Sequence, residues 1–396
     1  MTTTLEKTEL DLRAATRATY AAFIWAGVAM ATWATRIPQI RDELRLSPSQ
    51  LGLVLLAIAG GSITSLVLSG HLVSRFGSRR TVTAMAVLLV FALSGVALGY
   101  HLGVVPVIVG LFLFGFANGA WDVAMNVQGA VVEQGLGRSI MPRFHAGYSV
   151  GTVGGALLGT AAVALHVPVT LHLIVMAIAA GAATAVAVRR FVADGPSAEP
   201  STEGGMRRTL RFWTEPRTLL VGVFVLAFAF AEGTGIDWIA VAVIDDYHAP
   251  AAVGTLAFAV FMSAMTVGRW FGPTLLDRYG RVAVVRTLAV VSLVGLLLFV
   301  FGPSTPVAFA GALLWGAGAS LGFPVGMSAA SDDPKLAAPR VSVVASIGYC
   351  AFLGGPPLIG FLGDHVTVVR ALAAVAVLLG VATLLAGAIK PLRPTP

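Results

Sequence analysis

The chain has 396 residues, of which 57% are hydrophobic and only 11% are charged, and its mean hydropathy is +0.86. A soluble chain of this length needs far more charge to cover its surface, so the composition excludes a soluble globular protein. The formal net charge of +7 is compatible with nucleic-acid binding. The positions of the basic residues instead favour a signal for membrane orientation.

Apolar stretches recur along the chain, and each is close to the ~20 residues that a helix needs to cross a ~30 Å hydrocarbon core. A backbone in lipid must satisfy its own hydrogen bonds, so we expect these stretches to be helices. The sequence therefore predicts an all-α membrane protein with twelve transmembrane helices. The stretches lie at about 19–37, 49–73, 82–100, 104–131, 143–165, 167–188, 217–244, 251–275, 282–301, 306–330, 340–363 and 367–389.

The distribution of basic residues predicts the orientation. An even number of helices places both termini on one side of the membrane. All but four of the 26 Lys and Arg residues then lie on that side, the exceptions being Arg36, Arg41, Arg45 and Arg370. The positive-inside rule predicts that both termini are cytoplasmic in a multi-pass protein of the inner membrane. The same charge favours anionic lipid headgroups as partners, and nucleic acid is not expected.

The first stretch ends in TWATRIPQIRD, which contains Arg36. We expect Arg36 either to pair with a carboxylate of a transport cavity or to bind an anionic substrate. An arginine that extends to the membrane surface is an equally good interpretation.

The fourth stretch contains GFANGAWDVAMNVQG, with Asp122 between Asn118 and Asn126 at a spacing of four residues. This spacing places the three polar side chains on one helix face. An ionised Asp near the bilayer centre costs about 3 kcal/mol on insertion scales. We therefore expect Asp122 to line a water-filled cavity or to carry a proton, and a structural hydrogen bond to a neighbouring helix is the alternative.

The fifth stretch begins with His145 and Tyr148, and His145 is a candidate proton relay or a structural polar group. Glycine then recurs every four residues, which predicts a smooth face for close helix packing. These glycines are Gly147, Gly151, Gly155 and Gly159.

The seventh stretch contains AFAEGTGIDWIAVAV, with Glu232 and Asp237 as further candidates for the transport site. Gly233 and Gly235 predict a bent or unwound segment of the kind that transporters use at binding sites. On an unbroken helix the two acids lie about 140° apart, so both cannot face the cavity equally. Glu232 is nearer to the midplane of the membrane and is the better candidate for the cavity. Trp238 either stacks on a substrate or belongs to an interfacial tryptophan belt.

The polar segment 189–217 divides six helices from six, which predicts an N-terminal bundle over 1–190, a cytoplasmic linker over 191–216 and a C-terminal bundle over 217–396. The halves also align at a fixed offset. HAGYSVGTVGGALLG (145–159) matches SIGYCAFLGGPPLIG (346–360), pairing Tyr148 with Tyr349, and SRFGSR (74–79) matches DRYGR (277–281). Duplicated six-helix halves are typical of transporters, with the binding site at the midplane between them.

The loop sequence GHLVSRFGSRR (70–80) resembles the G-x-L-a-D-R-x-G-R-R signature of the major facilitator superfamily, although Ser74 stands at the acidic position. The second copy, DRYGR (277–281), keeps the acid. The resemblance implies two pseudo-symmetric six-helix bundles, a monomer, and a cytoplasmic gate formed by the motif residues. These are Arg75, Gly77, Arg79, Asp277, Arg278, Gly280 and Arg281.

GFANGAWDVAMNV followed by RFHAGYSVGTVGG is similar to the branch of this superfamily that contains bacterial fucose permease. That branch has an acid on its fourth helix with an asparagine four residues later, as Asp122 and Asn126 are spaced. His145 and Tyr148 stand where the sugar binder has amide side chains, so fucose itself is not the expected substrate.

The sequence predicts no enzyme, no metal and no cofactor, since it has no G-x-x-x-x-G-K-[ST] loop and Cys350 is its single cysteine. It predicts a secondary active transporter that moves a small polar solute, sugar-like or another metabolite, across the inner membrane by alternating access, with proton-coupled symport. The alternatives are a proton-driven efflux antiporter for hydrophobic compounds and a non-transporting membrane sensor or scaffold. The candidate site residues are Asp122, Asn118, Asn126, Glu232, Asp237, Trp238, Arg36, His145, Tyr148 and Tyr349.

Overall fold

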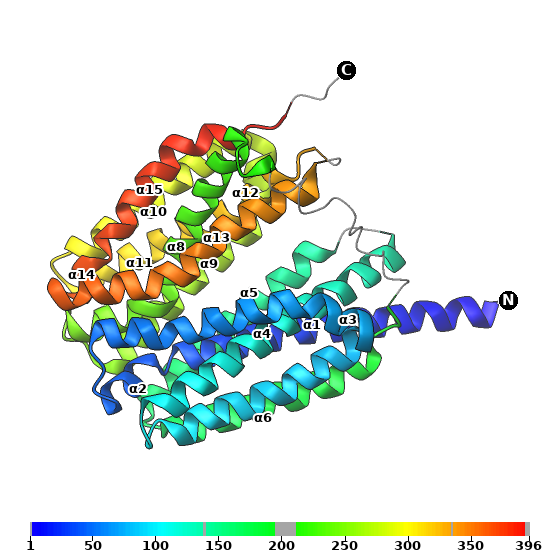
Figure 1. The fold of residues 1–396 in the computed structure, drawn as a ribbon, viewed down its shortest axis with the longest axis horizontal. Helices are drawn as coiled ribbons and strands as arrows, with labels where there is room; N and C mark the ends of the chain where they lie inside the picture. The colour runs from blue at the N-terminus through cyan, green and yellow to red at the C-terminus, as the bar shows by residue number, and fades with distance from the viewer. Residues whose placement is uncertain (1, 138–139, 195–210, 334–335, 393–396) are drawn as a thin grey trace. The chain divides into compact units, whose positions relative to one another are not determined.

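A computed structural model describes residues 2–137, 140–194, 211–333 and 336–392 (Figure 1). Within these ranges the regular structure is helical, and no strand is present. The helices are α1 (Thr2–Ala34), α2 (Ile37–Glu43), α3 (Pro48–Gly99), α4 (Val104–Leu136), α5 (Met141–Ala164), α6 (Val169–Ala187), η1 (Val188–Arg190), α8 (Pro216–Asp245), α9 (Ala251–Tyr279), α10 (Arg281–Phe301), α11 (Thr305–Ala319), α12 (Gly322–Ala330), α13 (Ala337–His365), α14 (Val368–Ala371), α15 (Ala373–Leu385) and η2 (Ala386–Ile389).

The predicted all-α membrane fold is confirmed. In the described part of the chain, ten helices are long and apolar enough to cross a membrane. One of them, α3, contains two of the predicted stretches. The two helical segments meet at Gly77, whose backbone is not helical, with φ 78° and ψ 160°. The first predicted stretch lies in α1, and the tenth and twelfth are each divided between two consecutive helices, α11 with α12 and α14 with α15.

The chain forms two compact units. Unit 1 comprises Met1–Leu46 and Leu53–Ala198, and unit 2 comprises Ser47–Gly52 and Glu199–Pro396. Within unit 1, α1 packs against α5, α6 and α4, whereas within unit 2, α8 packs against α13, α9 and α15. The main partner of the first helix in each unit is therefore the helix that carries the aligned repeat, α5 in unit 1 and α13 in unit 2.

The predicted glycine stripe of α5 lies against α1. A Cβ atom added to Gly151 would be 2.0 Å from the Ile24 carbonyl oxygen, and one added to Gly155 would be 2.8 Å from that of Val28. Both distances are far below van der Waals contact, so only glycine lets the two backbones approach this closely.

The two copies of the loop motif adopt the same backbone conformation. Gly77 has φ 78° and ψ 160°, and Gly280 has φ 78° and ψ 156°. L-residues with a side chain rarely occupy this region, so each copy requires glycine at this position. Each turn is also followed directly by a helix.

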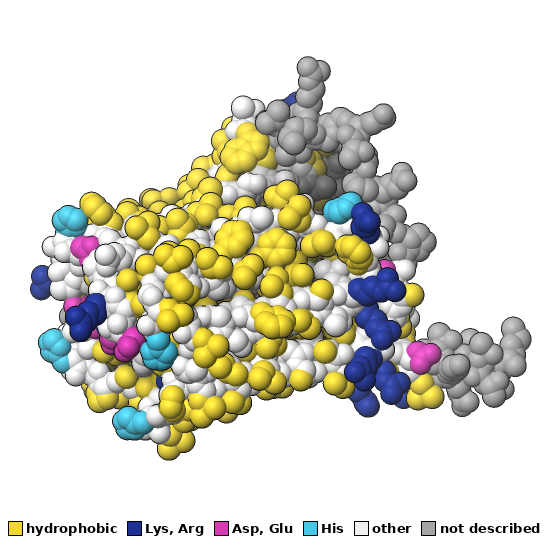
Figure 2. Space-filling view, turned by 60° about the horizontal axis from the view of Figure 1, so that its bottom comes forward, with side chains coloured by type: hydrophobic (Ala, Val, Ile, Leu, Met, Phe, Trp, Pro, Cys, Tyr) yellow, Lys and Arg dark blue, Asp and Glu magenta, His cyan; other side chains and the backbone are white. Residues whose placement is uncertain are grey.

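Hydrophobic side chains form a broad belt on the face drawn in Figure 2, and Lys and Arg gather at one end of it. Exposed large apolar residues include Phe91 at 69%, Val105 at 65% and Leu171 at 54%. Such a surface suits lipid rather than water.

Candidate functional site

The polar stripe of α4 lies on its less buried face. Asp122 is exposed, and Asn118 and Asn126 are partly exposed, whereas the intervening Trp121 is completely buried. The Asn126 side-chain amide donates to the Asp122 backbone carbonyl at 2.8 Å and to its Oδ1 at 3.2 Å. Among the described residues, the Asp122 carboxylate has no other hydrogen-bond partner and no cation within ion-pair distance.

Glu232 in α8 forms an ion pair with Arg269 in α9. The Arg269 Nη2 donates to both carboxylate oxygens, at 2.9 and 2.8 Å, and the Arg269 Nε donates to the Ser320 carbonyl at 3.3 Å. The Arg269 and Glu232 side chains are only 27% and 18% exposed. The sequence analysis missed this role, because it included Arg269 among the basic residues on the cytoplasmic side of the membrane.

The Ser320 carbonyl can accept from Arg269 because the backbone N–H that would normally bind it is missing. Its regular helical partner would be the N–H of residue 324, but Pro324 has none. The tenth span is accordingly interrupted, since α11 ends at Ala319 and α12 begins at Gly322. The Arg269 guanidinium thus takes the place of the missing backbone donor and also lies at the negative end of the α11 dipole.

The structure contradicts an unwound segment at Gly233 and Gly235, because α8 runs without interruption from Pro216 to Asp245. These glycines instead allow close packing. A Cβ at Gly235 would be 2.5 Å from the Phe261 ring, and one at Gly233 would be 3.2 Å from the Phe352 ring. The break that was expected in the seventh span lies in the tenth.

Asp237 is partly exposed and has no hydrogen-bond or ion-pair partner among the described residues. Trp238, its neighbour, is completely buried, and its indole N–H donates to no acceptor there. The ring therefore packs inside unit 2 and offers no open face to a ligand in this conformation.

Arg36 is also enclosed, with 2% of its surface exposed. Its Nε donates to the His172 Nδ1 at 2.9 Å, and its Nη2 donates to the Val167 carbonyl at 3.1 Å. These contacts fasten the end of α1 to the start of α6 within unit 1.

The remaining candidates lie on the repeated helices α5 and α13. His145 is exposed and lies 5.1 Å from the Phe23 ring in an edge-on arrangement. Tyr148 is partly exposed, and its repeat counterpart Tyr349 is 37% exposed and lies beside Phe352. Both tyrosines are thus on partly open helix faces in their own units.

At the first copy of the loop motif, Arg75 and Arg79 are exposed, and the guanidinium of Arg75 lies over the Phe76 ring. Sequence reasoning missed Asp194, which supplies an acid to a motif that has Ser74 at the acidic position. The Ser78 backbone N–H and hydroxyl both donate to the Asp194 carboxylate, the former at 2.6 Å. This carboxylate stabilises the positive N-terminal end of the helical segment that follows Gly77.

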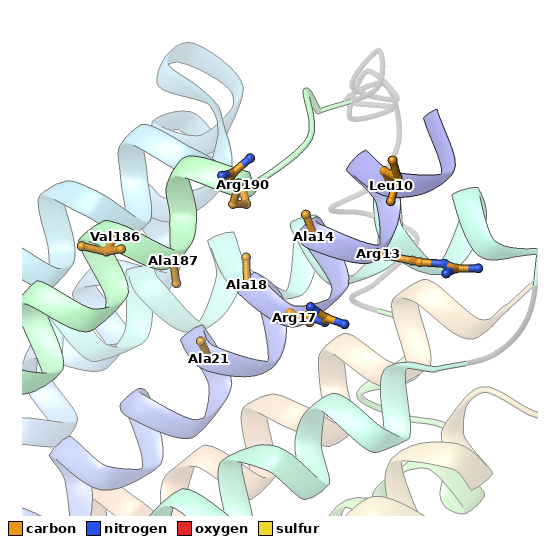
Figure 3. Close-up of a pocket in the computed structure, with 9 residues that line it drawn as sticks. All are labelled: Leu10, Arg13, Ala14, Arg17, Ala18, Ala21, Val186, Ala187 and Arg190. Carbon is orange, nitrogen blue, oxygen red and sulfur yellow. The ribbon is translucent and has the colours of Figure 1, made fainter. Parts of the chain in front are cut away.

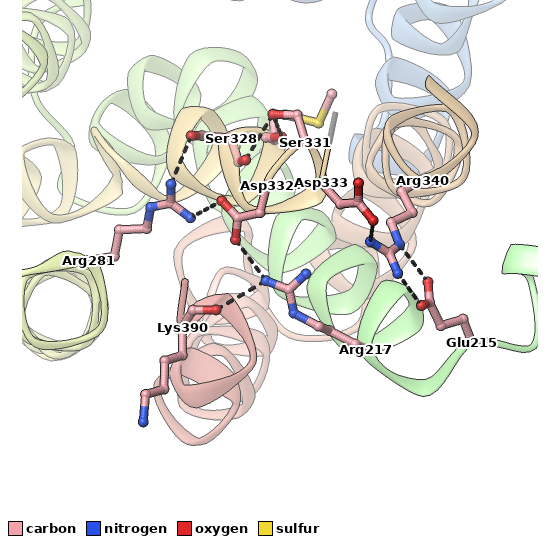
Figure 4. A network of polar contacts seen from close by, with 10 residues as sticks. Glu215, Arg217, Arg281, Ser328, Ser331, Asp332, Asp333, Arg340 and Lys390 are labelled. Atoms are coloured by element: carbon pink, nitrogen blue, oxygen red, sulfur yellow. Dashed lines mark hydrogen bonds and ion pairs between the residues drawn. The ribbon is translucent and has the colours of Figure 1, made fainter. Parts of the chain in front are cut away.

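At the second copy, Asp277 and Arg278 are exposed, and the Arg278 guanidinium lies over the Tyr279 ring. Arg281 pairs with Asp332 rather than with Asp277. Its Nη1 donates to the Asp332 Oδ1 at 2.7 Å, and Arg217 donates to the Oδ2 at 2.9 Å (Figure 4).

Figure 4 also shows an ion pair that joins Arg340 to Glu215, with distances of 2.9 and 2.6 Å. Glu215 precedes the membrane-spanning part of α8. Hydrogen bonds from Arg340 hold its pKa below the ordinary value, and a hydrogen bond from Thr218 acts in the same direction.

A cavity of about 640 Å³ lies between α1 and the end of α6 in unit 1 (Figure 3). We call it the arginine groove. Its lining combines an apolar floor with three arginines: Leu10, Arg13, Ala14, Arg17, Ala18, Ala21, Val186, Ala187 and Arg190. Three cations and no acid in the lining make it attractive to anions.

The chain is similar to known membrane transporters over almost its whole length. It is 31% identical over 352 residues to the uncharacterised transporter y4wD of Sinorhizobium fredii, covering 89% of this chain and 92% of that protein. Among solved structures, the chain is similar to the nucleoside transporter NupG, with a TM-score of 0.73 and 14% identity. The match covers 96% of this chain and 98% of the NupG chain. The match to the E. coli fucose:proton symporter FucP covers 94% of this chain and 98% of the FucP chain, with a TM-score of 0.65 and 16% identity.

The helical units, their repeated motif and these similarities define a multi-pass membrane transporter, which is not an enzyme. The sequence matches the Major Facilitator Superfamily over residues 18–338, and the chain belongs to that family. Proteins of this family bind small-molecule substrates, need no cofactor and typically work as monomers. In the described part of the chain, no cluster of His, Cys, Asp and Glu is suited to hold a metal ion.

Proposed function

We propose that this protein is a proton-coupled symporter that moves a small polar solute across the inner membrane by alternating access, with Asp122 as the proton-carrying residue. The observation that carries the proposal is the exposed Asp122 carboxylate, whose hydrogen-bond partner among the described residues is Asn126 on the same helix. Gaining or losing a proton there breaks no ion pair.

The polar character of the site favours a polar solute over hydrophobic cargo. Asn118, Asp122 and Asn126 give α4 an exposed hydrogen-bonding face, and the Glu232–Arg269 pair is partly exposed in α8 and α9. Two structural relatives are described as a nucleoside transporter and a fucose:proton symporter, which carry polar solutes.

The Asp122→Asn variant tests the proton assignment, because the amide imitates the protonated acid. A thermal-shift screen of purified protein first identifies a transported solute. In proteoliposomes, the variant should then exchange this solute across the membrane but fail to accumulate it under an imposed pH gradient. Normal accumulation by the variant would refute the assignment and make Glu232 the next candidate.

The cytoplasmic location of both termini is part of the proposal and is supported by the positive-inside distribution of Lys and Arg. Cysteines at the exposed positions Thr214 and Leu392, on a Cys350→Ala background, should resist impermeant thiol reagents in intact cells. A cysteine at Leu102, which is 82% exposed in the connection between α3 and α4, should react and serves as the control. Reaction at Thr214 or Leu392 would reverse the orientation.

The loop-motif residues Arg75, Gly77, Arg79, Asp277, Arg278, Gly280 and Arg281 are proposed to stabilise the state closed to the cytoplasm. Replacing Asp277 with Asn should shift the population toward the inward-open state. Spin labels on the motif ends of the two units would report the shift as longer distances, and unchanged distance distributions would leave the motif with an orientation role only.

Anionic lipid is the proposed partner of the arginine groove, since Arg13, Arg17 and Arg190 stand beside an apolar floor at the end of a membrane-spanning helix. Phosphatidylglycerol should raise the denaturation temperature of the purified protein more than phosphatidylcholine does. Replacing the three arginines with Gln should remove that difference. The same change at the exposed Arg143, Arg211 and Arg286 is the matched control.

A further inference from the structure

The Arg269 guanidinium has a defined and incomplete set of partners. Its Nη2 serves both oxygens of Glu232, and its Nε serves the Ser320 carbonyl. Its Nη1 donates to no acceptor in the described part of the chain, and it is not enclosed. An accessible edge of an intramembrane arginine therefore has unused donors.

Unused acceptors lie beside this edge. Each Glu232 oxygen accepts one hydrogen bond from Arg269, and a carboxylate has further lone pairs on both oxygens. Because Nη1 and Nη2 are bonded to the same carbon, the free donors are next to the carboxylate. The pair thus presents a donor and an acceptor side by side, and both carry charge, which makes their hydrogen bonds strong.

The net charge of the pair selects the class of ligand. An anion that approaches Nη1 is repelled by Glu232, and a cation that approaches Glu232 is repelled by Arg269. A neutral polyol has neither penalty, since one hydroxyl oxygen accepts from Nη1 and a neighbouring hydroxyl donates to the carboxylate. Neighbouring hydroxyls therefore match the pair in both polarity and charge.

The guanidinium is also held in place before any ligand arrives. Arg269 contacts Glu232 in α8 and the helix break at Ser320 simultaneously. The preceding Gly268 brings α9 against this break, because a Cβ there would be 2.3 Å from the Ser320 hydroxyl. A preorganised donor loses little side-chain entropy when it binds a ligand.

We infer that the Glu232–Arg269 pair recognises a neutral polyhydroxyl solute, with Arg269 Nη1 donating to one hydroxyl and Glu232 accepting from its neighbour. This inference rests on the proposed function as a transporter of a small polar solute and names the class of that solute.

The first experiment compares ligands that share a ring and differ in charge. Binding of D-glucose, D-galactose and D-ribose to the purified protein is measured by thermal shift and calorimetry, alongside D-glucuronate, D-galacturonate and D-glucosamine. We expect at least one neutral sugar to bind, and its charged counterpart to bind at least tenfold more weakly. Preferential binding of a uronate or the amine, or no binding of any neutral sugar, would overturn the inference.

The second experiment removes the pair. Glu232→Leu with Arg269→Met replaces both charges with apolar side chains of similar size, which avoids leaving an unpaired charge. The loss of two charge-assisted hydrogen bonds should weaken binding of the neutral sugar about a hundredfold. The matched control makes the same changes in the other Glu–Arg pair of unit 2, Glu215→Leu with Arg340→Met, and should retain the affinity.

Arg269→Lys gives an independent test if the double variant does not fold. Lysine keeps the charge opposite Glu232 but cannot provide the second arm of the fork, so neutral-sugar affinity should fall at least tenfold. Unchanged affinity in either folded variant would overturn the inference. Gradient-driven accumulation that persists in Asp122→Asn, by contrast, would refute the proton assignment while leaving the sugar-binding results intact.

Discussion

Asp122 in unit 1 and Glu232 in unit 2 are both carboxylates on membrane-spanning helices, yet only Glu232 lies against a cation. Arg269 donates to both Glu232 oxygens, whereas Asp122 receives a hydrogen bond from Asn126 on its own helix. An acid held by an ion pair is expensive to neutralise, because its partner is then left charged and unpaired. An acid without a cation changes its charge alone, which suits Asp122 to proton transfer and Glu232 to recognition.

The largest expected effect on stability comes from removing only one partner of the Glu232–Arg269 ion pair. Arg269→Met leaves Glu232 charged and without its cation, and should cost about 3 kcal/mol of the free energy of unfolding. Equilibrium denaturation in mixed micelles measures this loss. Asp122→Asn, which removes a charge that has no cation, should change stability by well under half as much. Equal losses in the two variants would remove the distinction between the units.

The two acids at the loop motifs give the next largest contrast. Asp332 in unit 2 is 9% exposed and bridges Arg217 and Arg281, so Asp332→Asn should cost about 2–3 kcal/mol. Asp194 in unit 1 caps a helix end at Ser78, and Asp194→Asn should cost about 1 kcal/mol. The same denaturation assay ranks them, and the reverse order would show that the bridge is worth less than the cap.

The glycine stripe of unit 1 predicts an effect of about 1–3 kcal/mol from a single methyl group. Gly151→Ala places a Cβ against the Ile24 carbonyl and should lower the denaturation temperature. Gly154→Ala is the matched control on the same helix, because no atom lies within 4 Å of its added Cβ. Similar behaviour of the two variants would mean that α5 is free to move away from α1.

The smallest effect is the pH dependence of the Glu215–Arg340 pair in unit 2. The pKa of Glu215 is lowered in the folded protein, mainly by hydrogen bonds from Arg340. Its contribution is therefore fully present above the unfolded carboxyl pKa of about 4.3 and is lost as pH falls through the lower folded value. Denaturation temperatures measured between pH 3 and 6, in roughly half-unit steps, should decline less in Arg340→Met than in the unaltered protein. An identical decline would show that Arg340 does not set this pKa.

Local patterns in the sequence predicted the parts of the site that a single helix creates. The four-residue spacing of Asn118, Asp122 and Asn126 is enough to place them on one face, and the structure leaves that face accessible. The spacing of the glycines in α5 likewise identifies a packing face, although it does not identify α1 as the partner.

Features that depend on tertiary structure were not predictable in this way. Glu232 and Arg269 are far apart in the sequence, and no periodicity links them. Gly233 and Gly235 have the composition of a flexible segment, but the packing of Phe261 and Phe352 decides their role. Pro324 was the available signal for the break in the tenth span, because its missing N–H can be located from the sequence alone.

The missing N–H at Pro324 also has a mechanical consequence. Because the regular helical donor to the Ser320 carbonyl is missing, this carbonyl accepts from Arg269, and any conformation that removes Arg269 must supply another donor. Arg269 is simultaneously attached to α8 through Glu232, so one side chain ties three helices together at a single point. A movement that separates α9 from α11 would break the Arg269 hydrogen bond and leave the Ser320 carbonyl without its donor. We therefore expect these helices to move together as one rigid body.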